Sequence, residues 1–265
     1  KTFEDFIYLT ETVKGELSCY APGDAWNTQT VDESKIQMLA ATSANIEDFQ
    51  DDTPVPEATL LVWFDDVAGG APDSDDVSDQ SGKVTLDLPT CTSVAYKTAT
   101  DPALEATIDT YEAHQIFGAD GEIQPFLSVS MTTYKLIPGI LGLKVDPGHA
   151  VIAGSIYGCD GQKVENAQVV VKHKGTDDIS QEGVVKYFED EFPNRGQKWT
   201  SADGLWNAIN VTDGEYVVEA WIYDGAEHVQ IGATEVKIVP DSINISNIYV
   251  GFGNGVRYPD SCLAQ

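Results

Sequence analysis

Basic side chains are scarce in this sequence. Fifteen lysines and arginines stand against 43 aspartates and glutamates, which gives a formal net charge of −28. A field of that sign repels nucleic acid and anionic membranes and attracts divalent cations or basic partners. The composition therefore argues against nucleic-acid binding. We interpret most of the charge as a source of solubility, with a specific cationic ligand as the alternative.

Long apolar runs and common enzyme fingerprints are also missing. No 18 consecutive residues are apolar, so no transmembrane segment is expected. Neither a GxSxG motif nor a P-loop nor a Rossmann fingerprint occurs. The chain starts at Lys1 without a charged and then apolar leader, which is consistent with an export signal that has been removed.

The sequence does contain an internal repeat. Residues 54–62 (PVPEATLLV) and 163–171 (KVENAQVVV) share the pattern VxxAx(L/V)xV. Each copy is preceded by a glycine-led strand that ends in a cysteine, at 15–19 and at 154–159. Each copy is followed by a turn with glycine and an alternating strand, at 81–88 and at 203–211.

Short alternating strands separated by turn residues predict an all-β fold of two tandem antiparallel, Ig-like β-sandwich domains. We place the domains at 1–145 and 146–265, because the turn-rich Val145–Gly148 lies just before the second copy. A short helix is one interpretation of residues 32–48. Residues 128–143 are expected to form a short helical connector, stopped or kinked at Pro138.

The second copy carries a family resemblance. The segments GSIYGCDGQKVENAQVVV and SADGLWNAINVTDGEYVVEAW resemble transthyretin-like or carboxypeptidase regulatory-like modules of bacterial surface proteins, over residues 155–239. The first copy matches more loosely over 13–99 and lacks the G-x-Y turn. TYKLIPGILGLKVDP also resembles secreted proteins or lipoproteins of myxobacteria-like bacteria. The resemblance implies a non-catalytic spacer, stabilising or adhesive module.

The four cysteines are far apart and form no CxxC or Cys/His cluster, which favours structural disulfides over zinc. An oxidising location follows, either extracellular or on the outer-membrane surface. If each module closes internally, Cys19 pairs with Cys91 and Cys159 pairs with Cys262. This is one of three connectivities, and four buried thiols are the alternative.

An acidic segment follows the first copy of the repeat. Asp73, Asp75, Asp76 and Asp79 could supply oxygen ligands to calcium. An EF-hand starting at Asp73 fails, because Val77 and Val84 stand at ligand positions. A solvated acidic hairpin without a cofactor is the alternative interpretation.

The second copy has the longer loop, over residues 174–200, and this loop is rich in aromatic residues. Tyr187, Phe188, Trp199 and Trp206 lie in it or beside it, and exposed flat rings could stack on a carbohydrate or another ligand. The alternative is that these side chains belong to the core.

An enzyme is the least favoured class. Intradiol-type dioxygenases have a related sandwich, and Tyr157, His173, Tyr187 and His228 offer the residue types of their iron site, but the two histidines are far apart in sequence. We therefore expect a non-catalytic, exported structural or interaction protein of the bacterial cell surface. Its expected partner is a protein or a glycan, and self-association is a further possibility.

Overall fold

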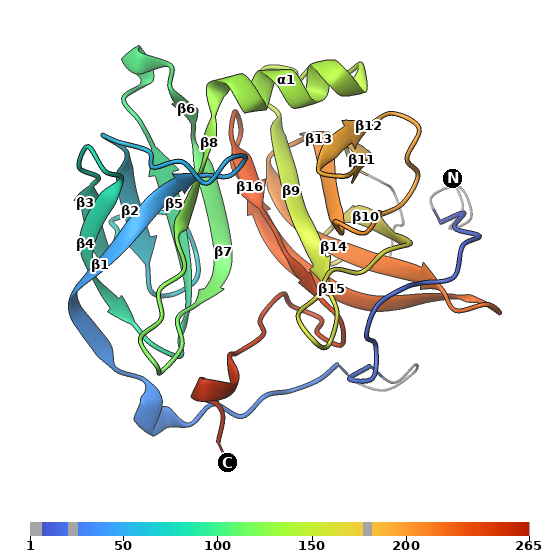
Figure 1. Cartoon of the computed structure of the whole chain (residues 1–265), viewed down its shortest axis with the longest axis horizontal. Helices are drawn as coiled ribbons and strands as arrows, with labels where there is room; N and C mark the ends of the chain where they lie inside the picture. Colours follow the sequence, from blue (N-terminus) through green and yellow to red (C-terminus); the bar gives the residue numbers. More distant parts are fainter. Residues whose placement is uncertain (1–6, 21–25, 177–181, 265) are drawn as a thin grey trace. The chain divides into compact units, whose positions relative to one another are not determined.

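The computed structural model describes residues 7–20, 26–176 and 182–264, and the fold they form is all-β, as the sequence predicts (Figure 1). The chain divides into two compact units, each built from two segments. The N-terminal sandwich comprises residues 29–134 and 257–265, and the C-terminal sandwich comprises residues 1–28 and 135–256. No helix within the described ranges is long and apolar enough to cross a membrane.

Two sheets form the N-terminal sandwich. Their strands are β1 Met38–Asp48, β2 Thr59–Trp63, β3 Ser74–Val77, β4 Lys83–Pro89, β5 Ser93–Ala99, β6 Thr107–Ile108, β7 Thr110–Ile116 and β8 Phe126–Ser130. One sheet has the order β4-β1-β8-β6 and the other has the order β7-β5-β2-β3. Alternate residues such as Leu60, Leu88 and Phe126 are fully buried and form the core.

Two sheets also form the C-terminal sandwich. Their strands are β9 Ala150–Tyr157, β10 Ala167–His173, β11 Val184–Glu189, β12 Phe192–Asn194, β13 Leu205–Val211, β14 Gly214–Tyr223, β15 His228–Ile238, β16 Ile243–Ile245 and β17 Ile248–Tyr249. One sheet has the order β12-β11-β13-β9-β16, with β17 also on β9, and the other has the order β10-β14-β15. Ile152, Trp206 and Tyr216 lie at the centre of the core.

Both sandwiches share one pattern of strand pairing. Strand β1 pairs with β4 antiparallel and with β8 parallel, and β9 pairs with β13 and β16 in the same two ways. Strands β2, β5 and β7 form an antiparallel set, as do β10, β14 and β15. The repeated VxxAx(L/V)xV pattern therefore leads into β2 and β10. Gly82 and Gly204, at φ +77° and +63°, supply the turns before β4 and β13.

Each sandwich is completed by a segment from the distant end of the chain. The C-terminal sandwich holds residues 7–20, in which Ile7 and Leu9 are each only 1% exposed. In the N-terminal sandwich, residues 257–264 lie beside residues 30–32, where the Ala264 amide donates to the Thr30 carbonyl at 3.0 Å. The predicted domain boundary between residues 145 and 146 misses this exchange of terminal segments. A single boundary in the sequence assigns each terminus to the domain next to it.

Two local expectations change in the structure. Residues 33–35 form a short 3-10 helix within the stretch 32–48, where a short helix is one interpretation of the sequence. Residues 38–48 form strand β1, which the sequence pattern did not predict. The connector is helical, as expected, over α1 Met131–Leu141, and Pro138 lies inside the helix. The helix ends at Gly142 (φ +75°), where the Leu143 amide donates to the Pro138 carbonyl and the Gly142 amide to the Gly139 carbonyl.

Candidate functional site

The acidic segment of the N-terminal sandwich directs its carboxylates to backbone amides. The Phe64 amide donates to Asp73 Oδ2 at 2.8 Å, and the Ser81 amide donates to Asp79 Oδ1 at 2.7 Å. Asp75 is exposed on strand β3. Among the described residues no three His, Cys, Asp or Glu side chains gather in a way that could hold a metal ion. Calcium binding at this segment stays a sequence prediction.

Strand β3 instead closes the open side of the N-terminal sandwich. It extends one sheet by pairing with β2, and its side chains reach the edge of the other sheet. The Thr85 amide on β4 donates to Asp76 Oδ2 at 2.7 Å, and the Asp87 amide donates to Ser74 Oγ at 3.2 Å. Unpaired amides on an edge strand invite pairing with another chain, so these contacts protect β4 from such pairing.

The aromatic loop likewise protects an edge strand in the C-terminal sandwich. Strand β11 extends the β13–β9 sheet, and the Tyr187 hydroxyl accepts a hydrogen bond from the buried Val169 amide of edge strand β10 at 2.8 Å. Thr200 Oγ1 accepts from the Ala167 amide of the same edge at 2.9 Å. Burial raises the pKa of Tyr187, so its hydroxyl stays protonated.

The predicted ligand-binding aromatics are mostly inside the fold. Trp206 and Tyr187 are buried in the core, Phe188 is buried as well, and Trp199 is half-buried. A buried ring has no open face on which a sugar could stack, so Tyr187, Phe188 and Trp206 cannot form a stacking platform in this state. Residues 177–181 of the predicted 174–200 loop lie outside the described residues.

Replacing Tyr187 with Phe should cost about 1–3 kcal/mol of unfolding free energy, because the Val169 amide would remain buried without an acceptor. Tyr223→Phe is the matched control, since its hydroxyl bonds to the Gly225 carbonyl at an exposed position, and it should cost less than about 0.5 kcal/mol. Guanidinium denaturation of both variants measures the difference. Equal losses would mean that Tyr187 does not close the β10 edge.

The predicted disulfide connectivity is wrong. Cys19 pairs with Cys159 in the C-terminal sandwich, and Cys91 pairs with Cys262 in the N-terminal sandwich. The prediction treated 15–19 as the first strand of the first module, whereas strand β1 takes that place and residues 7–20 belong to the other sandwich. Each bond therefore fastens one exchanged terminal segment to its sandwich.

The four residues of the proposed iron site have separate partners. The Tyr187 hydroxyl binds the Val169 amide, and His228 Nε2 lies 2.8 Å from the Leu9 carbonyl oxygen. His173 packs against the ring of Tyr216 at 4.6 Å between centroids, and Tyr157 stacks on Tyr249 at 5.4 Å. The described contacts give no sign of a shared metal site among them.

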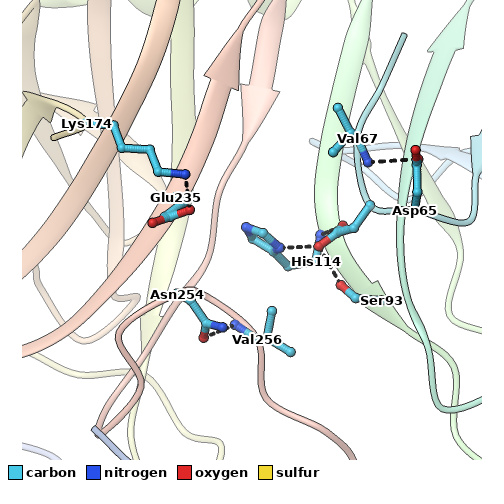
Figure 2. Close-up of polar contacts among 9 residues, drawn as sticks. Asp65, Val67, Ser93, His114, Lys174, Glu235, Asn254 and Val256 are labelled. Carbon is cyan, nitrogen blue, oxygen red and sulfur yellow. Dashed lines mark hydrogen bonds and ion pairs between the residues drawn. The ribbon is translucent and has the colours of Figure 1, made fainter. Parts of the chain in front are cut away.

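A half-buried polar cluster in the N-terminal sandwich has no signal in the sequence. The His114 and Ser93 side chains, both labelled in Figure 2, point at one carboxylate. Their hydrogen-bond partner is Asp66. His114 Nδ1 is 2.6 Å from Asp66 Oδ2, and Ser93 Oγ donates to the same oxygen at 2.7 Å. Burial raises the pKa of Asp66, but these hydrogen bonds outweigh it and hold the pKa below its ordinary value.

This cluster does not form a hydrolytic triad. Ser93 donates to Asp66 and not to the histidine, so no base is placed to activate its hydroxyl. Asp66 and His114 have φ of +60° and +64°, and the cluster holds these two irregular positions together. Sequence reasoning could not find the cluster, because Asp66 and His114 are 48 positions apart and form no motif.

A buried acid, Glu112, lies on the same strand as His114. The Tyr96 hydroxyl donates to Glu112 Oε2 at 2.5 Å and accepts from the Leu127 amide at 2.9 Å. Burial raises the pKa of Glu112 to about 7, against the opposing effects of the Tyr96 hydrogen bond and the charge of His114. The pair ties strands β5, β7 and β8 together and makes the core sensitive to pH.

Comparison with known proteins leaves the family open, since no family model and no curated protein matches the chain. The Bacillus anthracis TIE protein is 14% identical at a TM-score of 0.26, with 78% of this chain and 33% of that chain covered. The match therefore spans about a third of the TIE protein. A streptococcal ancillary pilin is 11% identical at a TM-score of 0.26, with 81% and 69% covered.

GBS52, the minor pilin of Streptococcus agalactiae, is 10% identical at a TM-score of 0.25, with 83% of this chain and 98% of that chain covered. Likeness this remote identifies neither a family nor a function.

Proposed function

We propose that this chain is a non-catalytic structural module of an exported bacterial surface protein. The observation that carries the proposal is the pair of disulfides that fasten exchanged terminal segments, one to each sandwich. Such bonds persist in oxidising surroundings, which supports a location outside the cytoplasm. A chain held near both ends in this way resists both unravelling from its termini and proteolysis.

Other features support the same role. The two regions that the sequence offers as binding loops contribute strands and side chains that close sheet edges. Closed edges suit a module that must remain folded beside many copies or other β proteins. The shared strand-pairing pattern supports a duplicated module, and the transthyretin-like or carboxypeptidase regulatory-like class is our proposal for its kind.

Thermolysin digestion tests the structural role. The bonds join residues separated by 140 and 171 positions, and in the chain-entropy model each stabilises the fold by about 5 kcal/mol. The oxidised chain should therefore remain intact under native conditions at a protease concentration that degrades the reduced and alkylated chain. Equal rates of cleavage would contradict the proposal. The circular dichroism of the reduced chain shows whether it unfolds or only loosens.

A further inference from the structure

The two disulfides differ in how far they are exposed to solvent. Cys91 and Cys262 are only 1% and 0% exposed, whereas Cys19 and Cys159 are both half-buried. A disulfide is exchanged when a thiolate reaches one of its two sulfurs, so access to the bond controls the rate. A thiol in solution can therefore reach the Cys19–Cys159 bond of the folded chain, whereas the Cys91–Cys262 bond is closed to it.

The contacts around the Cys19–Cys159 bond make its two sulfurs unequal. Cys159 Sγ accepts a hydrogen bond from the Cys19 amide at 2.9 Å. Cys19 Sγ instead lies 3.4 Å from the carbonyl oxygen of Val250. An N–H donor stabilises a thiolate, whereas a carbonyl oxygen disfavours one. Because a sulfur that forms the more stable thiolate leaves faster, Cys159 is the better leaving group and an incoming thiolate attacks Cys19.

The chain on either side of Cys19 is held by contacts that do not involve the disulfide. Lys14 and Glu165 exchange backbone hydrogen bonds at 3.0 and 2.9 Å, and their side chains form an ion pair at 2.7 Å. After Cys19, the Asn27 amide donates to the Gly251 carbonyl at 2.8 Å. Opening of the bond therefore releases the chain locally at Cys19, while these contacts keep the terminal segment on the C-terminal sandwich.

Acidic residues lie beside the Cys19–Cys159 bond. Asp160 follows Cys159 directly and is exposed, and the Cys159 amide donates to the carbonyl of Glu16, which is also exposed, at 2.8 Å. Within the described part of the chain, neither Glu16 nor Asp160 takes part in an ion pair. Their carboxylates repel a thiol compound that carries its own carboxylate and attract one that carries an ammonium group.

We propose that Cys19 is a site of thiol–disulfide exchange, at which a thiol compound without a carboxylate becomes covalently attached to the folded chain. The thiolate sulfur of that compound bonds to Cys19 Sγ, the Cys19–Cys159 bond breaks, and its electron pair leaves with Cys159 as a thiolate. The step needs no other oxidant or reductant. The Cys91–Cys262 bond stays formed, so the exchange adds an attachment site to the structural role proposed above and does not replace that role.

Trapping of the exchange product tests the site in the intact, oxidised chain. After short exposure to mercaptoethanol at mildly alkaline pH, excess iodoacetamide caps every free thiolate before Cys159 can attack the new bond. Mass spectrometry of unreduced peptides then locates the groups. The first product should carry mercaptoethanol on Cys19 and the alkyl group on Cys159, with Cys91–Cys262 intact and an unchanged circular dichroism spectrum. Attachment mainly to Cys159, or loss of the spectrum, would overturn the proposal.

The buried bond provides the matched control. A chain with Cys19→Ser and Cys159→Ser keeps only the Cys91–Cys262 bond, which should open roughly tenfold or more slowly than the Cys19–Cys159 bond of the wild type, because access limits the reaction. In guanidinium, which unfolds the chain, the two bonds of the wild type should open at similar rates. Equal rates in the folded chain, or an unchanged difference in guanidinium, would contradict a site that is selected by its exposure.

The charge of the thiol compound tests the preference for its class. At equal thiolate concentrations, cysteamine should react with Cys19 faster than mercaptoethanol, and thioglycolate should react more slowly. Glu16→Gln should narrow these differences, whereas Glu122→Gln, at an exposed position in the other sandwich, should not. Rates that are independent of charge would overturn the exclusion of carboxylate-bearing thiols. The structural role is tested separately by proteolysis, and it stands if both bonds resist exchange.

Discussion

Pulling the oxidised chain from its two ends should extend it by only about a third of its full length. The Cys19–Cys159 and Cys91–Cys262 bonds create a covalent route that runs from the first terminus to Cys19, from Cys159 back to Cys91, and from Cys262 to the end. This route contains roughly 90 residues, or about 30 nm at ~3.5 Å per residue, whereas the reduced chain reaches about 90 nm. Single-molecule force spectroscopy measures both lengths.

The two disulfide bonds contribute unequally to restricting the maximum extension of the oxidised chain. Without the Cys19–Cys159 bond, the covalent route runs from the first terminus directly to Cys91 and then from Cys262 to the end. The maximum extension is then about 33 nm, with ~3.5 Å per residue as before. Without Cys91–Cys262 the route runs from Cys159 to the end, and the limit rises to about 43 nm. Paired Cys→Ser variants provide the comparison. Equal lengths for the two variants would contradict the disulfide connectivity.

Glu112→Gln should remove a pH-dependent contribution of about 3 kcal/mol to the free energy of unfolding between pH 4.5 and pH 8. The folded-state pKa of Glu112 is about 7, above its ordinary value of 4.5, so between these pH values the folded protein binds more protons than the unfolded chain. Its contribution to stability is therefore full below about pH 4.5 and is lost as pH rises through 7. The Gln side chain can still accept the Tyr96 hydrogen bond but does not ionise.

The measurement is the free energy of unfolding in guanidinium at pH 4.5, 6 and 8. The difference between Glu112→Gln and the wild type should grow in favour of the variant by about 3 kcal/mol over this range, since each pKa unit corresponds to ~1.36 kcal/mol. The new amide group can add a constant difference in unfolding free energy, but this does not affect how the difference changes with pH. Glu122→Gln at an exposed position is the control and should show a flat difference. A flat difference for Glu112→Gln would contradict its burial as an ionisable acid.

Local patterns in the sequence were sufficient to predict the strand-rich fold and the equivalence of some strands in the two sandwiches. The VxxAx(L/V)xV pattern and the Ser81-Gly82 and Asp203-Gly204 turns identify equivalent strands, because alternation and turn chemistry depend on neighbouring residues. The same patterns misplaced 15–19, because a glycine, a single leucine and a cysteine do not distinguish a strand from a covering segment. Residues 38–48 include few buried apolar side chains, so their strand was not evident.

The sequence by itself determined the all-β class, the oxidised cysteines and the strong negative charge, since these depend on composition and on short-range spacing. Only the tertiary structure decided which cysteines meet, where Tyr187 and Asp76 direct their polar groups, and that Asp66, Ser93 and His114 come together. Each of these depends on contacts between residues distant in the chain, which follow from strand order and from the exchanged terminal segments. The disulfides are structural, as the sequence indicates, but their connectivity follows from packing that no local pattern records.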